Sequence, residues 1–212
     1  MMHFRGVSMG RCSADCTWLL VIGALGVGLW LAKDDFPGRH TIAAATEDLP
    51  GATPSTAPCF APEGPCARRA INALDAATKE IRGHAYNFTT LSGFPDALVR
   101  AADRGVDVQI VVDKTTPCER GTGVSALLAA GIPVYVDSEP PIAHEKAWII
   151  DEHLVVAGSY NWSAQAASNS EAMNFLDKPS NVAAYLDHWR QRQSISKPFG
   201  AEGFSKCRHP PV

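Results

Sequence analysis

The sequence predicts an α/β fold, in which a mixed β-sheet is flanked by helices. Short segments rich in β-branched residues alternate with segments whose apolar residues recur every three or four positions, as strands and helices do in α/β proteins. Near residue 150, two apolar segments follow each other with only the polar residues 151–153 between them, which is typical of a β-hairpin. A hairpin among such alternating elements makes the predicted sheet mixed.

The expected elements follow one another from residue 67. Apolar residues at helical spacing from Ala67 to Ile81 predict the first helix, and His84 to Phe88 is expected to be a strand. The later strands are expected at 106–113, 133–136, 147–150, 154–157 and 171–175, and the later helices around 94–101, 124–128 and 182–189. Gly105 and Gly131 follow two of these helices, where glycine commonly ends a helix.

The chain has 212 residues, which suits one domain with an N-terminal appendage. An uninterrupted apolar run from Trp18 to Ala32 follows two arginines, so residues 1–36 are interpreted as a signal-anchor, with a cleaved signal peptide as the alternative. This charge order predicts that the rest of the chain lies on the periplasmic or extracellular side, membrane-anchored or secreted. Residues 37–58, rich in Pro, Ala and Thr, predict a flexible linker, and residues 59–212 the folded domain.

Four cysteines lie in the predicted domain: Cys59, Cys66, Cys118 and Cys207. An even number of cysteines in an oxidising compartment predicts two disulfides. Closeness in sequence favours Cys59 with Cys66, which leaves Cys118 for Cys207. A zinc site that uses these thiols is the alternative, although the sequence contains no CxxC pair.

Polar residues that could catalyse a reaction or bind a ligand flank the predicted hairpin. His144 and Lys146 precede its first strand two positions apart, so they are expected to project together at one end of the sheet. A histidine can act as nucleophile or general acid, and a lysine can hold a phosphate oxygen. After the second strand, Gly158 permits a close approach of the backbone, while Ser159 and Asn161 offer neutral hydrogen-bond donors.

These groups together predict a phosphate site. The hairpin is expected to bring the segment 158–162 beside His144 and Lys146, where ammonium, imidazole, hydroxyl and amide groups suit a tetrahedral or trigonal-bipyramidal phosphate. Glu171 follows soon after and is expected to orient the imidazole of His144 through its second ring nitrogen.

The motif HEKAWIID at 144–151, followed by GSYNW at 158–162, resembles the HKD signature of the phospholipase D superfamily. The similarity extends over roughly residues 59–189. It is strongest to the branch with a single motif, which holds small EDTA-resistant bacterial endonucleases and mitochondrial cardiolipin-hydrolase-like proteins. The resemblance implies a phospholipase D-like fold and a mechanism without metal or cofactor, in which one histidine forms a phosphohistidine and another protonates the leaving alcohol.

The resemblance also assigns roles to individual residues. It makes His144 the nucleophile or the acid, and Glu171 the residue that holds it. Asp151 and Gly158 take structural roles. Three residues would bind the phosphate: Lys146, Ser159 and Asn161.

The implied chemistry uses two histidines, but the chain carries one motif. The other histidines of the domain core, His84, His153 and His188, have no lysine two positions on, and we interpret them as surface residues or as satisfied core residues. We therefore expect a two-fold homodimer whose protomers share one active site.

Composition leaves the substrate open. A net charge of −3 argues against a strongly basic protein that binds nucleic acid non-specifically. The basic tail from Arg190 to Val212 is expected to contact a nucleic-acid backbone and favours an endonuclease acting on DNA or RNA. The alternative is a phospholipase D on membrane phospholipids of phosphatidylcholine or cardiolipin type, held at the membrane by the N-terminal segment, with Phe94, Trp148 and Trp162 as lipid contacts. A non-catalytic binding module is the third hypothesis.

Overall fold

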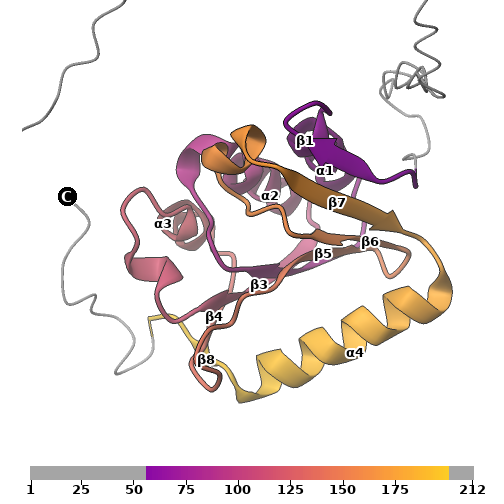
Figure 1. Ribbon diagram of the computed structural model, residues 1–212. Coiled ribbons are helices and arrows are strands. Elements are labelled where there is room, and N and C mark those ends of the chain that lie inside the picture. The colour runs from indigo at the N-terminus through magenta and orange to yellow at the C-terminus, as the bar shows by residue number, and fades with distance from the viewer. Residues whose placement is uncertain (1–55, 201–212) are drawn as a thin grey trace, which may run out of the picture. The chain divides into compact units, whose positions relative to one another are not determined.

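The computed structural model describes residues 56–200, which form a single mixed sheet with helices on both faces (Figure 1). The expected α/β architecture is thus confirmed. The expected signal-anchor, most of the expected linker and residues 201–212 lie outside the described residues. Within residues 56–200, no helix combines the length and the apolar character needed to cross a membrane.

The sheet has eight strands in the order β1-β7-β6-β5-β2-β3-β4-β8. They are β1 (Cys59–Ala61), β2 (Glu80–Ala85), β3 (Asp107–Asp113), β4 (Val134–Asp137), β5 (Lys146–Ile150), β6 (Leu154–Gly158), β7 (Glu171–Leu176) and β8 (Lys197–Pro198). Strands β2, β3 and β4 are parallel, because a helix connects each to the next, whereas the other pairs are antiparallel. The hairpin expected near residue 150 is β5–β6, at the centre of the sheet.

The helices divide unequally between the two faces of the sheet. One face is covered by α1 (Cys66–Asp75), α2 (Phe94–Asp103) and α3 (Val124–Ala129), and the other by α4 (Pro179–Ile195) (Figure 1). Short 3-10 helices occupy Thr90–Ser92, Thr116–Cys118 and Ala164–Ser168. Gly105 and Gly131 follow α2 and α3 with φ of 88° and 73°, the left-handed conformation expected of a glycine that ends a helix.

The first helix and the first long strand differ from the expectation. Ile81 continues the helical spacing of apolar residues, but α1 ends at Asp75 and Ile81 is a buried residue of β2. The strand expected at 84–88 begins four residues earlier, and Phe88 makes an isolated bridge to Trp162. Backbone groups of residues 78–80 bind a carboxylate more than 70 residues away, so a tertiary contact overrides the local pattern here.

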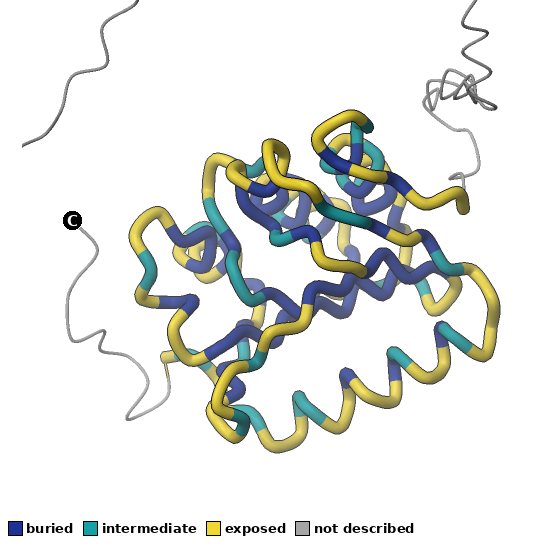
Figure 2. Tube along the Cα trace, in the orientation of Figure 1, coloured by how far each residue is buried: buried dark blue, intermediate teal, exposed yellow. Residues whose placement is uncertain are grey.

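The main core lies between the sheet and helices α1–α3, and the central strands are almost wholly buried (Figure 2). Its centre is a group of three aromatic rings in mutual contact, Phe94, Trp148 and Trp162, whose ring centroids are 4.9 to 6.3 Å apart. All three side chains are fully buried, so the expectation that they contact lipid is wrong. A smaller core beneath α4 contains Val182, Leu186 and Trp189.

Candidate functional site

The site is built around the end of β5 where the chain enters the strand. His144 is exposed in the preceding loop, and Lys146, the first residue of β5, is 6% exposed. Lys146 Nζ lies 3.0 Å from Nδ1 of His144 and donates to the backbone oxygen of His144 at 2.6 Å. The structure therefore brings the two residues together, as their spacing predicts.

Tyr86 completes the surroundings of this pair. Its ring lies 4.3 Å from the His144 ring, centroid to centroid, and the Lys146 ammonium lies 5.0 Å from the Tyr86 ring centre. Burial lowers the pKa of Lys146, and the negative charge of Glu171 acts in the opposite direction. The result is an ammonium with little water around it, held against an imidazole that faces solvent.

The end of β6 supplies the second polar segment. The Ser159 hydroxyl donates to Oε2 of Glu171 at 2.5 Å and accepts from the Ala172 backbone N–H at 3.1 Å. Before it, Gly158 pairs with Met173 of β7 so closely that a Cβ at position 158 would lie 2.1 Å from the Ala172 carbonyl oxygen. Glycine is therefore required at position 158 for the strands to approach.

Glu171 does not occupy the position expected for it. Its carboxylate accepts from Ser159 and, through Oε1, from the Asn169 amide at 3.1 Å, rather than from the imidazole of His144. In this arrangement Glu171 fixes the Ser159 hydroxyl and adds negative charge near Lys146. The sequence could place Glu171 near the site, but not choose between two neighbouring partners.

Asn161 lies beside the site rather than in its pocket. Its amide oxygen is buried and has no hydrogen-bond partner within residues 56–200. A buried polar atom without a partner costs free energy, on the order of 1–3 kcal/mol. This oxygen can only accept a hydrogen bond, so a phosphate oxygen could be bound only by the amide NH₂ of Asn161.

Asp151 lies at the opposite end of β5. Its carboxylate accepts four hydrogen bonds, from Thr78 N and Oγ1 at 2.8 and 2.9 Å, Lys79 N at 2.8 Å and Glu80 N at 3.0 Å. Burial acts to raise the pKa of Asp151, but these hydrogen bonds outweigh it and the pKa is lowered. The geometry is that of a structural residue, which joins the β5–β6 turn to the start of β2.

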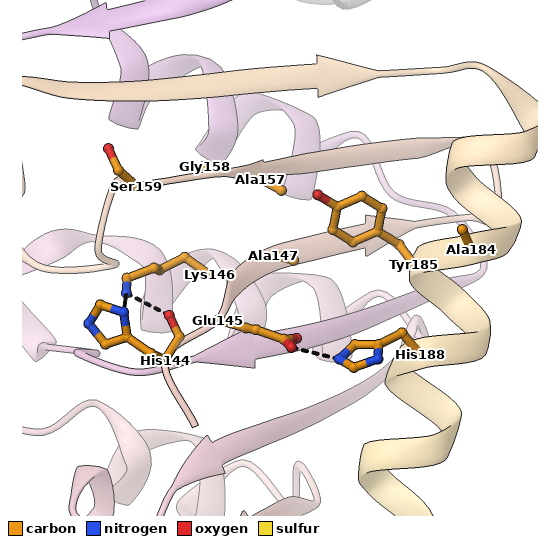
Figure 3. Close-up of a pocket in the computed structure, with 10 residues that line it drawn as sticks. All are labelled: His144, Glu145, Lys146, Ala147, Ala157, Gly158, Ser159, Ala184, Tyr185 and His188. Atoms are coloured by element: carbon orange, nitrogen blue, oxygen red, sulfur yellow. Dashed lines mark hydrogen bonds and ion pairs between the residues drawn. The ribbon is translucent and has the colours of Figure 1, made fainter. Parts of the chain in front are cut away.

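A pocket of about 580 Å³ opens between this site and α4 (Figure 3). His144, Lys146 and Ser159 form its polar side, and small apolar residues continue it toward the helix. From α4, Tyr185 and His188 close the other side (Figure 3). The pocket is thus large enough for a phosphodiester together with part of an attached group.

Sequence reasoning missed several residues around this pocket. Glu145 lies between His144 and Lys146 and, by strand alternation, points the other way, toward His188 (Figure 3). His84 is a buried residue, and its Nε2 lies 3.2 Å from the Glu145 carboxylate without a hydrogen bond in the described part of the chain. Strand alternation could have shown that Glu145 points away from His144 and Lys146. No local sequence pattern could have shown that α4 brings His188 to it.

The cysteines follow the disulfide expectation as far as the structure describes them. Cys59 and Cys66 form a disulfide with an S–S distance of 2.05 Å. Cys118 is also disulfide-bonded, and its expected partner, Cys207, lies outside the described residues. A zinc site that uses the thiols of Cys59, Cys66 or Cys118 is therefore wrong.

Comparison with known proteins places this site in context. A family model described as "Cardiolipin synthase, PLD-like domain" matches residues 70–193. A phospholipase D of Rickettsia bellii is 33% identical over 137 residues, which are 64% of this chain and 68% of that protein. The human mitochondrial cardiolipin hydrolase is 32% identical over 162 residues, which are 74% of this chain and 64% of that protein.

A solved structure shows the same relationship. The crystal structure of a phospholipase D family member, Nuc from Salmonella typhimurium, has a TM-score of 0.63 and 34% identity to this chain. The match covers 69% of this chain and 99% of the solved Nuc chain, so the matched part of this chain corresponds to nearly all of that structure. NucT from Helicobacter pylori shares the fold, with a TM-score of 0.60 at 20% identity.

Proposed function

This chain belongs to the phospholipase D superfamily and is a phosphodiester hydrolase, and we propose that it is a metal-independent endonuclease acting through a phosphohistidine at a site shared by two protomers. The main support for this proposal is the arrangement of His144 and Lys146. A solvent-facing imidazole lies 3.0 Å from a buried ammonium at the mouth of a pocket. This places a nucleophile beside the positive charge that a phosphate needs.

The proposed reaction has two displacements at phosphorus. In the first, a ring nitrogen of His144 attacks phosphorus, the bond to the leaving alcohol breaks, and His144 of the partner subunit gives that alcohol its proton. In the second, the partner's histidine takes a proton from water, the hydroxide attacks phosphorus, and the bond to nitrogen breaks. Lys146 neutralises the charge of the non-bridging oxygens, the Asn161 amide NH₂ donates to them, and the Ser159 hydroxyl donates to them once its proton turns from Glu171.

A polynucleotide is the substrate that we favour. The motif resembles those of small bacterial endonucleases, the imidazole is exposed to an incoming polymer, and the aromatic residues expected to touch lipid are in the core. The basic tail offers less support than expected in its described part, because Arg192 is paired with Asp137 at 2.6 Å and Arg190 lies 3.5 Å from Glu152. Binding would therefore depend on Lys146 of both protomers.

A phospholipase D activity is the second candidate. The relatives named phospholipase D and cardiolipin hydrolase support it, as does the small apolar side of the pocket formed by Ala147, Ala157 and Ala184. Ile142, two residues before His144, is 55% exposed and would face an acyl chain. A membrane anchor at residues 1–36, on the periplasmic or extracellular side, would serve this activity more directly than a nuclease.

One assay distinguishes the two activities. The full chain is incubated in EDTA with single-stranded DNA, double-stranded DNA, RNA, and liposomes of phosphatidylcholine or cardiolipin, with His144→Ala as the control. We expect EDTA-resistant cleavage of at least one nucleic acid that His144→Ala abolishes. Headgroup release without cleavage of any nucleic acid would contradict the nuclease assignment, and a metal requirement would contradict the mechanism.

The shared site has its own test. Wild-type and His144→Ala chains with different tags are mixed, and the heterodimers are purified. Because each site would need both imidazoles, we expect the heterodimer to have less than about one hundredth of the wild-type rate. A heterodimer with half of the wild-type activity would show that each protomer works alone.

A further inference from the structure

Three side chains meet beneath α4, next to the pocket but on the other side of Glu145 from the phosphate site. His84 comes from β2, Glu145 from the loop before β5, and His188 from α4. The Glu145 carboxylate lies 2.6 Å from Nε2 of His188 and 3.2 Å from Nε2 of His84. One possible ligand atom from each residue lies within 4.8 Å of those of the other two.

The fold explains why these residues meet. His84 of β2 is paired in register with Ala147 of β5. Glu145, two residues before Ala147, points to the same face of the sheet, so it lies beside His84 on the side toward α4. His188 is one turn along α4 from Ala184, and its ring centroid is 5.8 Å from that of His84. Figure 3 shows Glu145 turned toward His188 and away from His144 and Lys146.

His84 gives the independent indication of a ligand. Its side chain is buried, and its Nε2 lies 3.2 Å from the Glu145 carboxylate but makes no hydrogen bond of good geometry among residues 56–200. A buried imidazole nitrogen and a carboxylate that face each other without a hydrogen bond are placed as two ligands of one metal ion are.

We propose that His84, Glu145 and His188 bind a divalent transition-metal ion of the zinc type. Two imidazole nitrogens and one carboxylate oxygen are a common ligand set for zinc, with the fourth position of the tetrahedron left for water. The cluster borders a second cavity of about 230 Å³, which has room for that water.

The surrounding charges are compatible with a cation. Asp137 and Arg192 also line the smaller cavity, and they neutralise each other through an ion pair of 2.6 Å. Glu145 therefore supplies the uncompensated negative charge of the cluster. Nothing in the proposed hydrolysis passes through this ion; it would instead connect α4 to β2 and to the loop that carries His144.

Metal binding by the full chain is the test. The protein is stripped with EDTA, dialysed, and titrated with Zn²⁺ by calorimetry, and Co²⁺ is added separately to read the coordination from its visible absorption. His188→Ala is the test variant, because His188 is 45% exposed and its truncation leaves the core intact. His153→Ala is the matched control, since His153 is an exposed histidine on the β5–β6 turn.

We expect wild type and His153→Ala to bind one more Zn²⁺ per chain than His188→Ala, or to bind it at least about tenfold more tightly. The intense absorption of tetrahedral Co²⁺ should likewise be lost only in His188→Ala, and Glu145→Gln should repeat that loss. Any Zn²⁺ bound by other histidines or cysteines is the same in wild type and variants, so it cancels when they are compared.

Equal stoichiometry and affinity in wild type and His188→Ala would overturn the proposal, as would the weak spectrum of six-coordinate Co²⁺ in wild type. Zn²⁺ should also raise the Tm of wild type and His153→Ala more than that of His188→Ala, because an ion that binds only the folded state stabilises it. All readouts are made without substrate, so a failure of the proposed nuclease activity would leave them unaffected.

Discussion

The two ends of β5 carry the two halves of one sequence motif, and they are built in opposite ways. At one end, His144 is exposed and Lys146 is a buried cation beside it. At the other end, about 17 Å from Lys146 along an extended strand, the carboxylate of Asp151 is held by four hydrogen bonds. The spacing within the motif therefore corresponds to the length of one strand. One end of that strand carries the proposed catalytic residues, and the other is fixed to the start of β2 by hydrogen bonds.

Removing the imidazole of His144 should show most clearly that this end of β5 serves activity rather than stability. We expect His144→Ala to lower the rate of phosphodiester hydrolysis by about 10³-fold or more, because the nucleophile and the acid are both lost from the shared site. Its Tm should stay close to that of wild type, since the side chain is exposed. The rate is measured on the best substrate found in EDTA. A loss of less than tenfold would remove His144 from the reaction.

Lys146→Met should lower the same rate by about 10²–10³-fold, since a methionine fills the space of lysine but cannot hold an anionic oxygen. Because burial lowers the pKa of Lys146, activity should fall on the alkaline side at a pH below the usual lysine value of about 10.4. Above that pKa the amine is neutral and the phosphate loses its partner. A rate profile that stays flat to pH 10.5 would contradict this role.

Asp151→Asn should act on stability instead. An amide cannot accept all four hydrogen bonds, so we expect a loss of about 2–3 kcal/mol in the free energy of unfolding, measured in urea. Thr78→Ala, which removes one of the donors, should cost about 1 kcal/mol. The rate per folded molecule should stay within about threefold of wild type in both. A large loss of rate in folded Asp151→Asn would show that this end also takes part in the chemistry.

The Asp151 anchor should also respond to pH. Its pKa is lowered in the folded state, so the carboxylate contributes stability above the unfolded value of about 3.9, and this contribution disappears as pH falls through the folded value. The difference in Tm between wild type and Asp151→Asn should therefore be constant near neutral pH and shrink in acid. A difference that grows on acidification would contradict the anchor.

Among the variants of the site, Glu171→Gln should have the smallest effect on rate, a loss of about tenfold or less, because Ser159 keeps an acceptor for its hydroxyl. If Glu171 instead holds His144 during catalysis, the loss should approach that of His144→Ala. The single variant therefore decides between the arrangement in the structure and the one that the family resemblance implies. The matched variant Ser159→Ala, which removes the partner hydroxyl, is expected to lose a similar amount.

The sequence predicted those parts of the fold and site that depend on local spacing. Strand alternation placed His144 and Lys146 together at the start of β5, the apolar run placed Asp151 just after its end, and Gly105 and Gly131 marked the ends of α2 and α3. These signals are local because a few neighbouring residues determine them.

The parts that the sequence did not predict depend on contacts between distant residues. Ile81 fits a helical pattern, but backbone groups beside it bind Asp151 and hold the segment as a strand. His84 and His188 meet although 104 positions separate them, and no short pattern contains both. Trp148 and Trp162 are equally apolar in a core or at a membrane, and only their burial decides between these.

The two edge strands restrict how copies of this chain could associate. The outer strands of the sheet are β1, with three residues, and β8, with two, one of which is Pro198. Proline has no N–H to donate, and strands this short present few unpaired backbone groups. The described sheet is therefore poorly suited to continue across a subunit boundary, and we expect its association to use side chains. Such strands also protect the sheet against edge-to-edge aggregation.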